Sequence, residues 1–122
     1  MGNRRYYENP LECPVTRTVN ILGGRWKSII LYCLSGGKLR FGQLAAYIPT
    51  ISRKVLTKQL RELEADRLIT RTEFKEIPPR VEYEISELGK TVFPILEVMK
   101  KWGEEEGIQI EEKQKLSRES AS

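Results

Sequence analysis

Few side chains in this sequence could act as nucleophiles, general bases or metal ligands. It contains two cysteines, Cys13 and Cys33, and no histidine. Because histidine is the commonest general base and the usual partner of a catalytic serine or cysteine, its absence disfavours catalytic triads and Cys-His pairs. A zinc site would need cysteine and carboxylate ligands alone, and two cysteines are too few for a disulfide framework. We therefore expect no enzyme activity, no metal site and no cofactor.

Cys13 is the side chain with the clearest reactive potential. Pro14 fits the first position of a helix, which places Cys13 at the N-cap. There, free backbone N–H groups and the positive end of the helix dipole stabilise a thiolate, and Arg17 lies one turn further on. The alternative is a small cap residue beside the core, and the residues alone favour neither interpretation. Cys33 shares an apolar stripe with its neighbours, so we expect a buried and inert thiol.

A predicted helix at residues 52–65 concentrates positive charge on one face. Ser52 is a favourable N-cap, and Leu56, Leu60 and Leu63 recur at the helical interval i, i+4, i+7. At about 100° per residue, the polar side chains fall on the face opposite the leucines. The residues of this face that we expect to contact DNA, together with the cap, are Ser52, Arg53, Lys54, Thr57, Lys58 and Arg61. Such polarity suits a helix whose N-terminal part enters the major groove, although an ordinary solvated face is the alternative.

The segments before this helix predict the elements that must position it. Residues 14–22 and 25–35 form helices that end at paired glycines. Residues 38–40 form a short extended link, and residues 41–48 give one to two further helical turns. The connector 48–51 then joins that short helix to the basic one. Two short helices with so tight a turn are typical of a helix-turn-helix motif.

The segments after the basic helix predict a β-hairpin. Residues 68–76 are rich in β-forming side chains, residues 80–86 alternate apolar and charged side chains, and the intervening 77–79 contain two prolines. This arrangement indicates a β-wing that follows the helix-turn-helix. Arg80, at the turn, is expected to reach a phosphate or the minor groove. Arg40, in the same basic part of the chain, completes the expected DNA-binding set.

A last helix from Ser86 to Trp102 carries more apolar surface than a small winged domain can cover. Pro94 lies inside it, so we expect a bend there. A second copy of the chain is the natural cover for this surface and for the apolar face of the 14–22 helix. The expected dimer interface comprises Val15, Val19, Val92, Ile95, Leu96, Met99 and Trp102.

Length and charge fit a single DNA-binding domain. The chain has 122 residues, which suffices for one core. We expect an arm at 1–12, a winged helix-turn-helix domain with dimerisation helices at 13–103, and a charged tail at 104–122 that is either a loose helix or disordered. The first two thirds of the chain are basic, which suits binding to a polyanion. The last third is acidic, which better suits binding to protein. Without a long apolar run or a secretory signal pattern, we expect a cytoplasmic protein.

The order of these motifs resembles one family. The stretches CPVTRTVNILGGRWKSIILYCL, LRFGQL, ISRKVLTKQLRELEADRLI and IPPRVEYEISELG are similar to the HxlR family of bacterial winged helix-turn-helix regulators, a branch close to MarR, over about residues 13–103. The resemblance implies a homodimer on a palindromic operator, with 52–65 as recognition helix and 68–86 as wing. It also implies oxidant or quinone sensing at the position of Cys13 in some members. Arg67 departs from the pattern, because many members have glycine there.

The fold class expected is therefore α+β, mostly α: a winged helix-turn-helix with extra N- and C-terminal dimerisation helices. The expected function is sequence-specific binding of double-stranded DNA as a homodimeric transcriptional regulator. An oxidant or a small-molecule effector is a further candidate partner, and composition does not reveal which. The alternative function is a winged-helix module that binds protein or RNA, since fold alone does not determine function.

Overall fold

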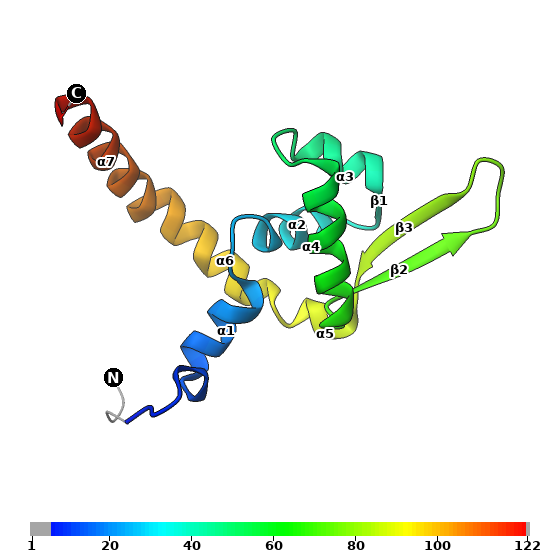
Figure 1. Cartoon of the computed structure of the whole chain (residues 1–122), viewed down its shortest axis with the longest axis horizontal. Helices are drawn as coiled ribbons and strands as arrows, with labels where there is room; N and C mark the ends of the chain where they lie inside the picture. The colour runs from blue at the N-terminus through cyan, green and yellow to red at the C-terminus, as the bar shows by residue number, and fades with distance from the viewer. Residues whose placement is uncertain (1–5, 122) are drawn as a thin grey trace.

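The computed structural model describes residues 6–121, and its helices and strands follow the predicted order (Figure 1). Of the expected N-terminal arm, residues 1–5 lie outside the described residues. The elements up to the wing are η1 (Pro10–Glu12), α1 (Pro14–Leu22), α2 (Lys27–Leu34), β1 (Leu39–Arg40), α3 (Phe41–Tyr47), α4 (Arg53–Ala65), β2 (Ile69–Phe74) and β3 (Arg80–Ile85). They are followed by α5 (Glu87–Lys90), α6 (Phe93–Trp102), η2 (Gly103–Gly107) and α7 (Ile108–Ala121). The winged helix-turn-helix fold is thus confirmed.

Local sequence signals account for the start of α4. The side chain of Ser52 accepts a hydrogen bond from the backbone N–H of Val55 over 3.1 Å, as an N-cap residue should. The preceding turn is equally tight, because the N–H of Ile51 donates to the carbonyl of Ile48. These bonds order the connection between α3 and α4, the two helices of the helix-turn-helix.

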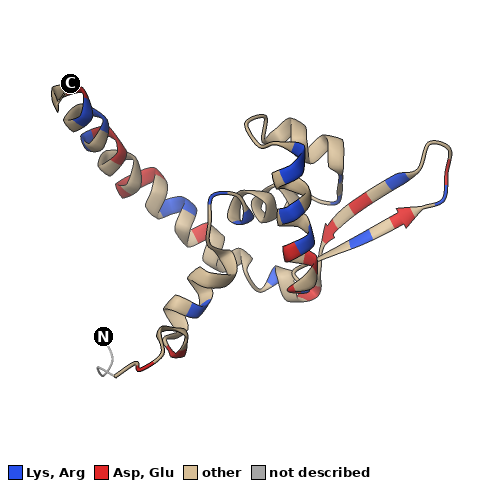
Figure 2. Ribbon diagram, in the orientation of Figure 1, with Lys and Arg blue, Asp and Glu red and all other residues tan. Residues whose placement is uncertain are grey.

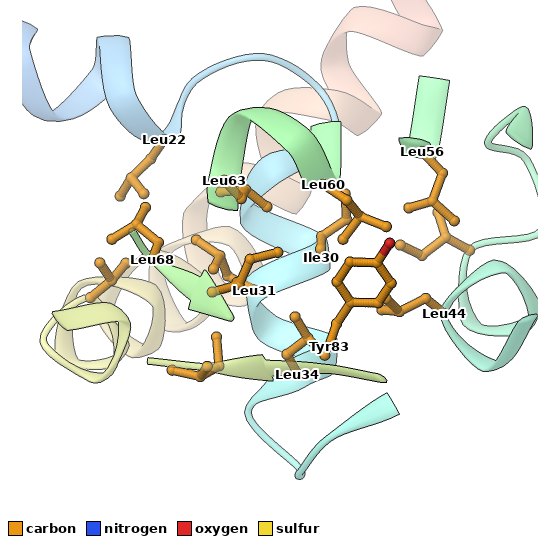
Figure 3. Packing of buried hydrophobic residues seen from close by; sticks show 14 of the residues in the cluster. Leu22, Ile30, Leu31, Leu34, Leu44, Leu56, Leu60, Leu63, Leu68 and Tyr83 are labelled. Atoms are coloured by element: carbon orange, nitrogen blue, oxygen red, sulfur yellow. The ribbon is translucent and has the colours of Figure 1, made fainter. Parts of the chain in front are cut away.

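A single core anchors α4 against α2 and the sheet. Leu56, Leu60 and Leu63 are almost completely buried, and so are Ile30 and Leu34 of α2. Figure 3 shows these side chains converging with those of Leu31, Leu44 and Tyr83. The predicted apolar stripe of α4 therefore faces inward, which leaves its polar face free to meet a partner.

The wing is a three-stranded antiparallel sheet in the order β1-β3-β2. The long hairpin pairs Ile69 with Ile85 at its base and Phe74 with Arg80 near its tip. The sequence predicted the hairpin but only an extended link at 38–40. In the structure that link pairs with β3, with Leu39 opposite Tyr83, because an extended segment satisfies its backbone groups at an open sheet edge. The sheet is thereby tied to the start of α3.

The predicted single helix from Ser86 to Trp102 is divided in two, and this part of the prediction was wrong. α5 ends at Lys90, and α6 begins at Phe93 with Pro94 in its first turn. A proline lacks the N–H that would bond to the carbonyl four residues earlier, and its ring clashes with that carbonyl, whereas the first helical turn accommodates both properties. Pro94 therefore starts a new helix instead of bending an existing one.

The charged tail is helical. From α6 the chain continues through the π-helical turn η2 into α7, and Figure 1 shows these three elements as one rod that leads away from the wing. Of the two alternatives left open for residues after Glu104, the helical extension is the one observed. No helix among residues 6–121 is long and apolar enough to cross a membrane.

Candidate nucleic-acid interface

The exposed face of α4 brings together the cations that the sequence predicted for DNA contact. Figure 2 shows blue bands along this helix. One shallow hollow is lined by Arg53, Lys54, Thr57, Lys58, Arg61 and Glu62. The four cations are exposed, while Thr57 is half-buried and donates its hydroxyl to the carbonyl of Arg53 over 2.8 Å. Ser52 acts as the cap, so its hydroxyl is already engaged at the helix start.

An ion pair that the sequence did not reveal holds α4 against α2. The ammonium of Lys27 lies 3.0 Å from the carboxylate of Glu62, and the Lys27 side chain is only 15% exposed. The hydrogen bond from Lys27 keeps the pKa of Glu62 below its ordinary value. Because α3 separates the two residues along the chain, no local pattern could indicate the pair. The pair joins the start of α2 to α4 beside the exposed cations of α4.

The start of α3 lies beside the start of α4. The guanidinium of Arg53 stacks over the ring of Phe41, 4.9 Å from its centroid, which limits the directions in which this side chain can point. Arg40 precedes Phe41 as the N-cap of α3, where its backbone N–H donates to the side chain of Gln43 over 2.9 Å. The side chain of Arg40 is exposed and borders a hollow that it shares with the wing loop.

Arg80 is held inside the wing. Its guanidinium forms ion pairs with Glu76 at 3.3 Å and with Glu82 at 3.8 Å, and it stacks over Phe74 at 4.1 Å from the ring centroid. Two carboxylates therefore balance its charge, and its side chain is 28% exposed. The predicted contact of Arg80 with a phosphate or the minor groove stays a prediction; Arg80 is half-buried, whereas the four cations of α4 are exposed.

Cys13 occupies the predicted N-cap of α1. The backbone N–H and the side chain of Thr16 lower the pKa of its thiol, and weaker contributions come from Val15 and Tyr7 against an opposing effect of burial. These donors lie in the first turn of α1, where a residue at the N-cap meets free backbone N–H groups. Arg17, expected to assist, donates instead to the carbonyl of Leu11 over 3.1 Å.

Cys33 has the opposite environment. It is half-buried and packs against the core, and burial raises the pKa of its thiol. A raised pKa leaves less of the reactive thiolate at neutral pH. The pKa values of the two thiols are therefore shifted in opposite directions, and a reactive Cys13 stays a prediction.

The apolar residues expected at a dimer interface divide into two groups. Val92 and Leu96 are buried in the core of their own chain, with 8% and 5% exposure, so this chain already covers them without a partner. The sequence could not separate them from their neighbours because they lie on the same broad apolar side of the predicted helix. The other five, which remain exposed, are Val15, Val19, Ile95, Met99 and Trp102.

Comparison with known proteins agrees with this geometry. A family model described as HxlR-like helix-turn-helix matches residues 21–111. The helix-turn-helix (HTH)-type transcriptional regulator YybR of Bacillus subtilis (strain 168) is 44% identical over 101 residues, which are 83% of this chain and 81% of YybR. The structure of the redox regulator HypR in its reduced form is 42% identical, with a TM-score of 0.78, over 82% of this chain and 99% of HypR. Its oxidised form is 46% identical, with a TM-score of 0.72, over 75% and 95% of the two chains. This chain therefore belongs to the HxlR-like helix-turn-helix family.

Proposed function

We propose that the protein is a transcriptional regulator that binds double-stranded DNA sequence-specifically, as a homodimer on an inverted-repeat operator. The observation that carries the proposal is the exposed cationic face of α4 opposite its buried leucines. Membership of the HxlR-like family supports it, as does the name of the similar protein YybR, an HTH-type transcriptional regulator.

The chemistry of α4 suits the major groove. Arginine and lysine donate to the O6 and N7 acceptors of guanine, and the positive end of the helix dipole attracts phosphate. Replacing Arg53 or Lys54 by alanine should cost on the order of 1 to 3 kcal/mol where a base edge is contacted, and should relax sequence preference at that position. Where a phosphate is contacted, the loss should be equal for all sequences and should flatten the salt dependence by about one unit of slope.

A second copy of the chain is the proposed cover for the exposed apolar side chains. Val15 and Val19 of α1 and Ile95, Met99 and Trp102 of α6 together present an apolar surface that water would otherwise meet. Pairing across a two-fold axis would place two α4 helices about one DNA turn apart, so half-sites should be spaced by roughly 10 base pairs. Sedimentation at micromolar concentration should show the dimer. A monomer under those conditions would contradict this part of the proposal.

Oxidation of Cys13 is the proposed signal that changes DNA affinity. The lowered thiol pKa favours the thiolate, and the similar protein HypR is named a redox regulator. Two Cys13 thiols, one from each protomer, would lose two electrons and two protons to an oxidant and form one disulfide. Alternatively, the sulfur of a single Cys13 would add to a ring carbon of a quinone, and the thiol proton would pass to the quinone oxygen. Either product would change the position of α1 and hence the spacing of the two α4 helices.

The redox proposal has a direct test. DNA titrations with and without diamide, on the wild type and on Cys13→Ser, should show an oxidant effect in the wild type alone. Thiol labelling should be faster at Cys13 than at Cys33, because the pKa of Cys13 is lowered and that of Cys33 is raised. Equal affinities in all four titrations would remove the redox response and leave the DNA-binding proposal intact.

Binding of RNA or protein is the second candidate function. The cationic first half of α4 argues against a protein-binding helix, which would more often carry apolar side chains there. A mobility shift assay with DNA from the region upstream of the gene and with an equal mass of structured RNA separates the candidates. We expect a discrete complex with DNA and only weak, salt-sensitive binding to RNA. The reverse preference would overturn the DNA proposal.

A further inference from the structure

The tip of the wing carries an isoleucine that is completely exposed. Ile77 has a relative exposure of 103% and lies in the loop between β2 and β3 (Figure 1). The neighbouring Pro78 and Pro79 are exposed as well. Single exposed apolar residues are common on protein surfaces. The position of Ile77 is unusual because it lies in the loop at the end of the hairpin, which Figure 1 shows extending away from α4.

The base of the loop is clamped, so Ile77 is presented on a rigid support. Arg80 reaches across the hairpin to Glu76 at 3.3 Å and stacks on the ring of Phe74, 4.1 Å from its centroid. Within the loop, the rings of Pro78 and Pro79 fix the backbone angle φ. Holding an apolar side chain in place before binding lowers the entropy lost when a partner covers it.

The charges of the wing do not provide a strong attraction for phosphate. Residues 69–85 contain three basic side chains and four acidic ones, a net charge of −1. Figure 2 shows the two signs interspersed along both strands. The arginine nearest to the tip is engaged by Glu76 and Glu82. What the tip offers a partner is therefore apolar surface, and the partner must supply apolar surface in return.

The wing is long enough to reach a neighbouring minor groove. A strand of six residues such as β2 spans about 20 Å. In B-DNA the minor groove lies half a helical turn from the major groove, or about 17 Å along the axis. The wing loop also faces the helix-turn-helix, because Arg40, Phe41 and residues 76–81 border one hollow. Since Arg53 stacks on Phe41, the loop and the start of α4 lie on the same side of the domain.

We propose that Ile77 packs into the minor groove beside each major-groove half-site, against the sugar walls, and that it selects A·T pairs there. This inference rests on the proposed binding of α4 in the major groove. A guanine presents its N2 amino group in the minor groove, and an apolar side chain would bury that donor without a partner. An A·T pair presents no such donor. The wing thereby adds sequence preference outside the bases that α4 contacts.

Inosine provides a sharp test, because an I·C pair has the minor groove of A·T and nearly the major groove of G·C. We would select an operator from fragments of the source genome and locate the flanking minor groove by hydroxyl-radical footprinting. Operators with A·T, I·C or G·C at that flank would then be titrated with the wild type, Ile77→Ser and Ile77→Val. Thermal unfolding should be the same for all three proteins, because residue 77 is fully exposed.

The wild type and Ile77→Val should bind the A·T and I·C operators equally and the G·C operator roughly tenfold more weakly. Ile77→Ser should bind all three alike, at about the affinity of the wild type for G·C. If the wild type bound the three operators with equal affinity, the assignment would be overturned, and Ile77 would instead be expected to contact a protein. The same holds if Ile77→Ser kept the discrimination. Failure of the wild type to select any DNA would instead refute the proposed function.

Discussion

Replacing Arg67 by glycine should stabilise the protein. Arg67 lies between α4 and β2 with φ of 62°, in the left-handed region, which costs an L-residue roughly 1 to 2 kcal/mol. Its backbone bonds do not depend on the side chain: its N–H donates to the carbonyl of Glu64 over 2.9 Å, and its carbonyl accepts from the hydroxyl of Ser86 over 2.6 Å. Glycine loses more backbone entropy on folding, about 0.5 to 1 kcal/mol. The expected net gain is about 0.5 to 1 kcal/mol.

The assay is chemical and thermal unfolding of the wild type, Arg67→Gly and Arg67→Ala at one protein concentration. For a chain of this length the gain corresponds to a rise in Tm of about 2 to 5 °C. Arg67→Ala is the matched control, because it removes the same charged side chain but keeps the Cβ and hence the strain. If alanine stabilised the protein as much as glycine, the gain would come from removing charge, and the conformational reasoning would be refuted.

Three further changes test the packing around α4. Lys27→Met should destabilise the protein at pH 7, because Lys27 lowers the pKa of Glu62 in the folded protein. The stability that this ion pair contributes is present above the pKa of Glu62 in the unfolded chain and is lost as the pH falls through its pKa in the folded protein. In urea unfolding, the difference in stability between the wild type and Lys27→Met should therefore shrink below about pH 4. Gly89→Ala should cost about 1 to 3 kcal/mol in the same assay, because a Cβ would overlap the carbonyl oxygen of Leu68. Leu60→Ala should cost about 2 to 5 kcal/mol by leaving a cavity in the core, and a smaller loss would place that side chain outside it.

Elements with a local signal could be predicted from the sequence. The cap of Ser52, the three leucines of α4 and the strand at β3 each depend on neighbours within a few residues, and the structure confirms all three. Within β3 the predicted alternation of burial holds from Tyr83 to Ile85, whereas Arg80, Val81 and Glu82 are all half-buried. The fold of the helix-turn-helix and wing followed from their order. The cationic face of α4 could be predicted in the same way, because helical periodicity alone separates it from the buried side.

Features that depend on distant contacts could not be predicted in the same way. The pair of Lys27 with Glu62 and the pairing of β1 with β3 join segments far apart in sequence. The engagement of Arg80 by two carboxylates depends on the rotamers around the hairpin, which composition does not specify. The burial of Leu96 depends on which side of α6 its own chain covers.

The accessible cations of α7 provide a matched control for the central claim that α4 binds DNA. One triple variant replaces Arg53, Lys54 and Lys58 by alanine, and the other removes the same charge from exposed Lys113, Lys115 and Arg118.

The decisive measurement is the affinity of both triple variants for the selected operator across a range of salt concentrations. The α4 variant should lose specific binding and most of the salt dependence, whereas the α7 variant should bind within a few-fold of the wild type. Equal losses in both variants would mean that overall charge, and not the face of α4, determines binding, which would contradict the account.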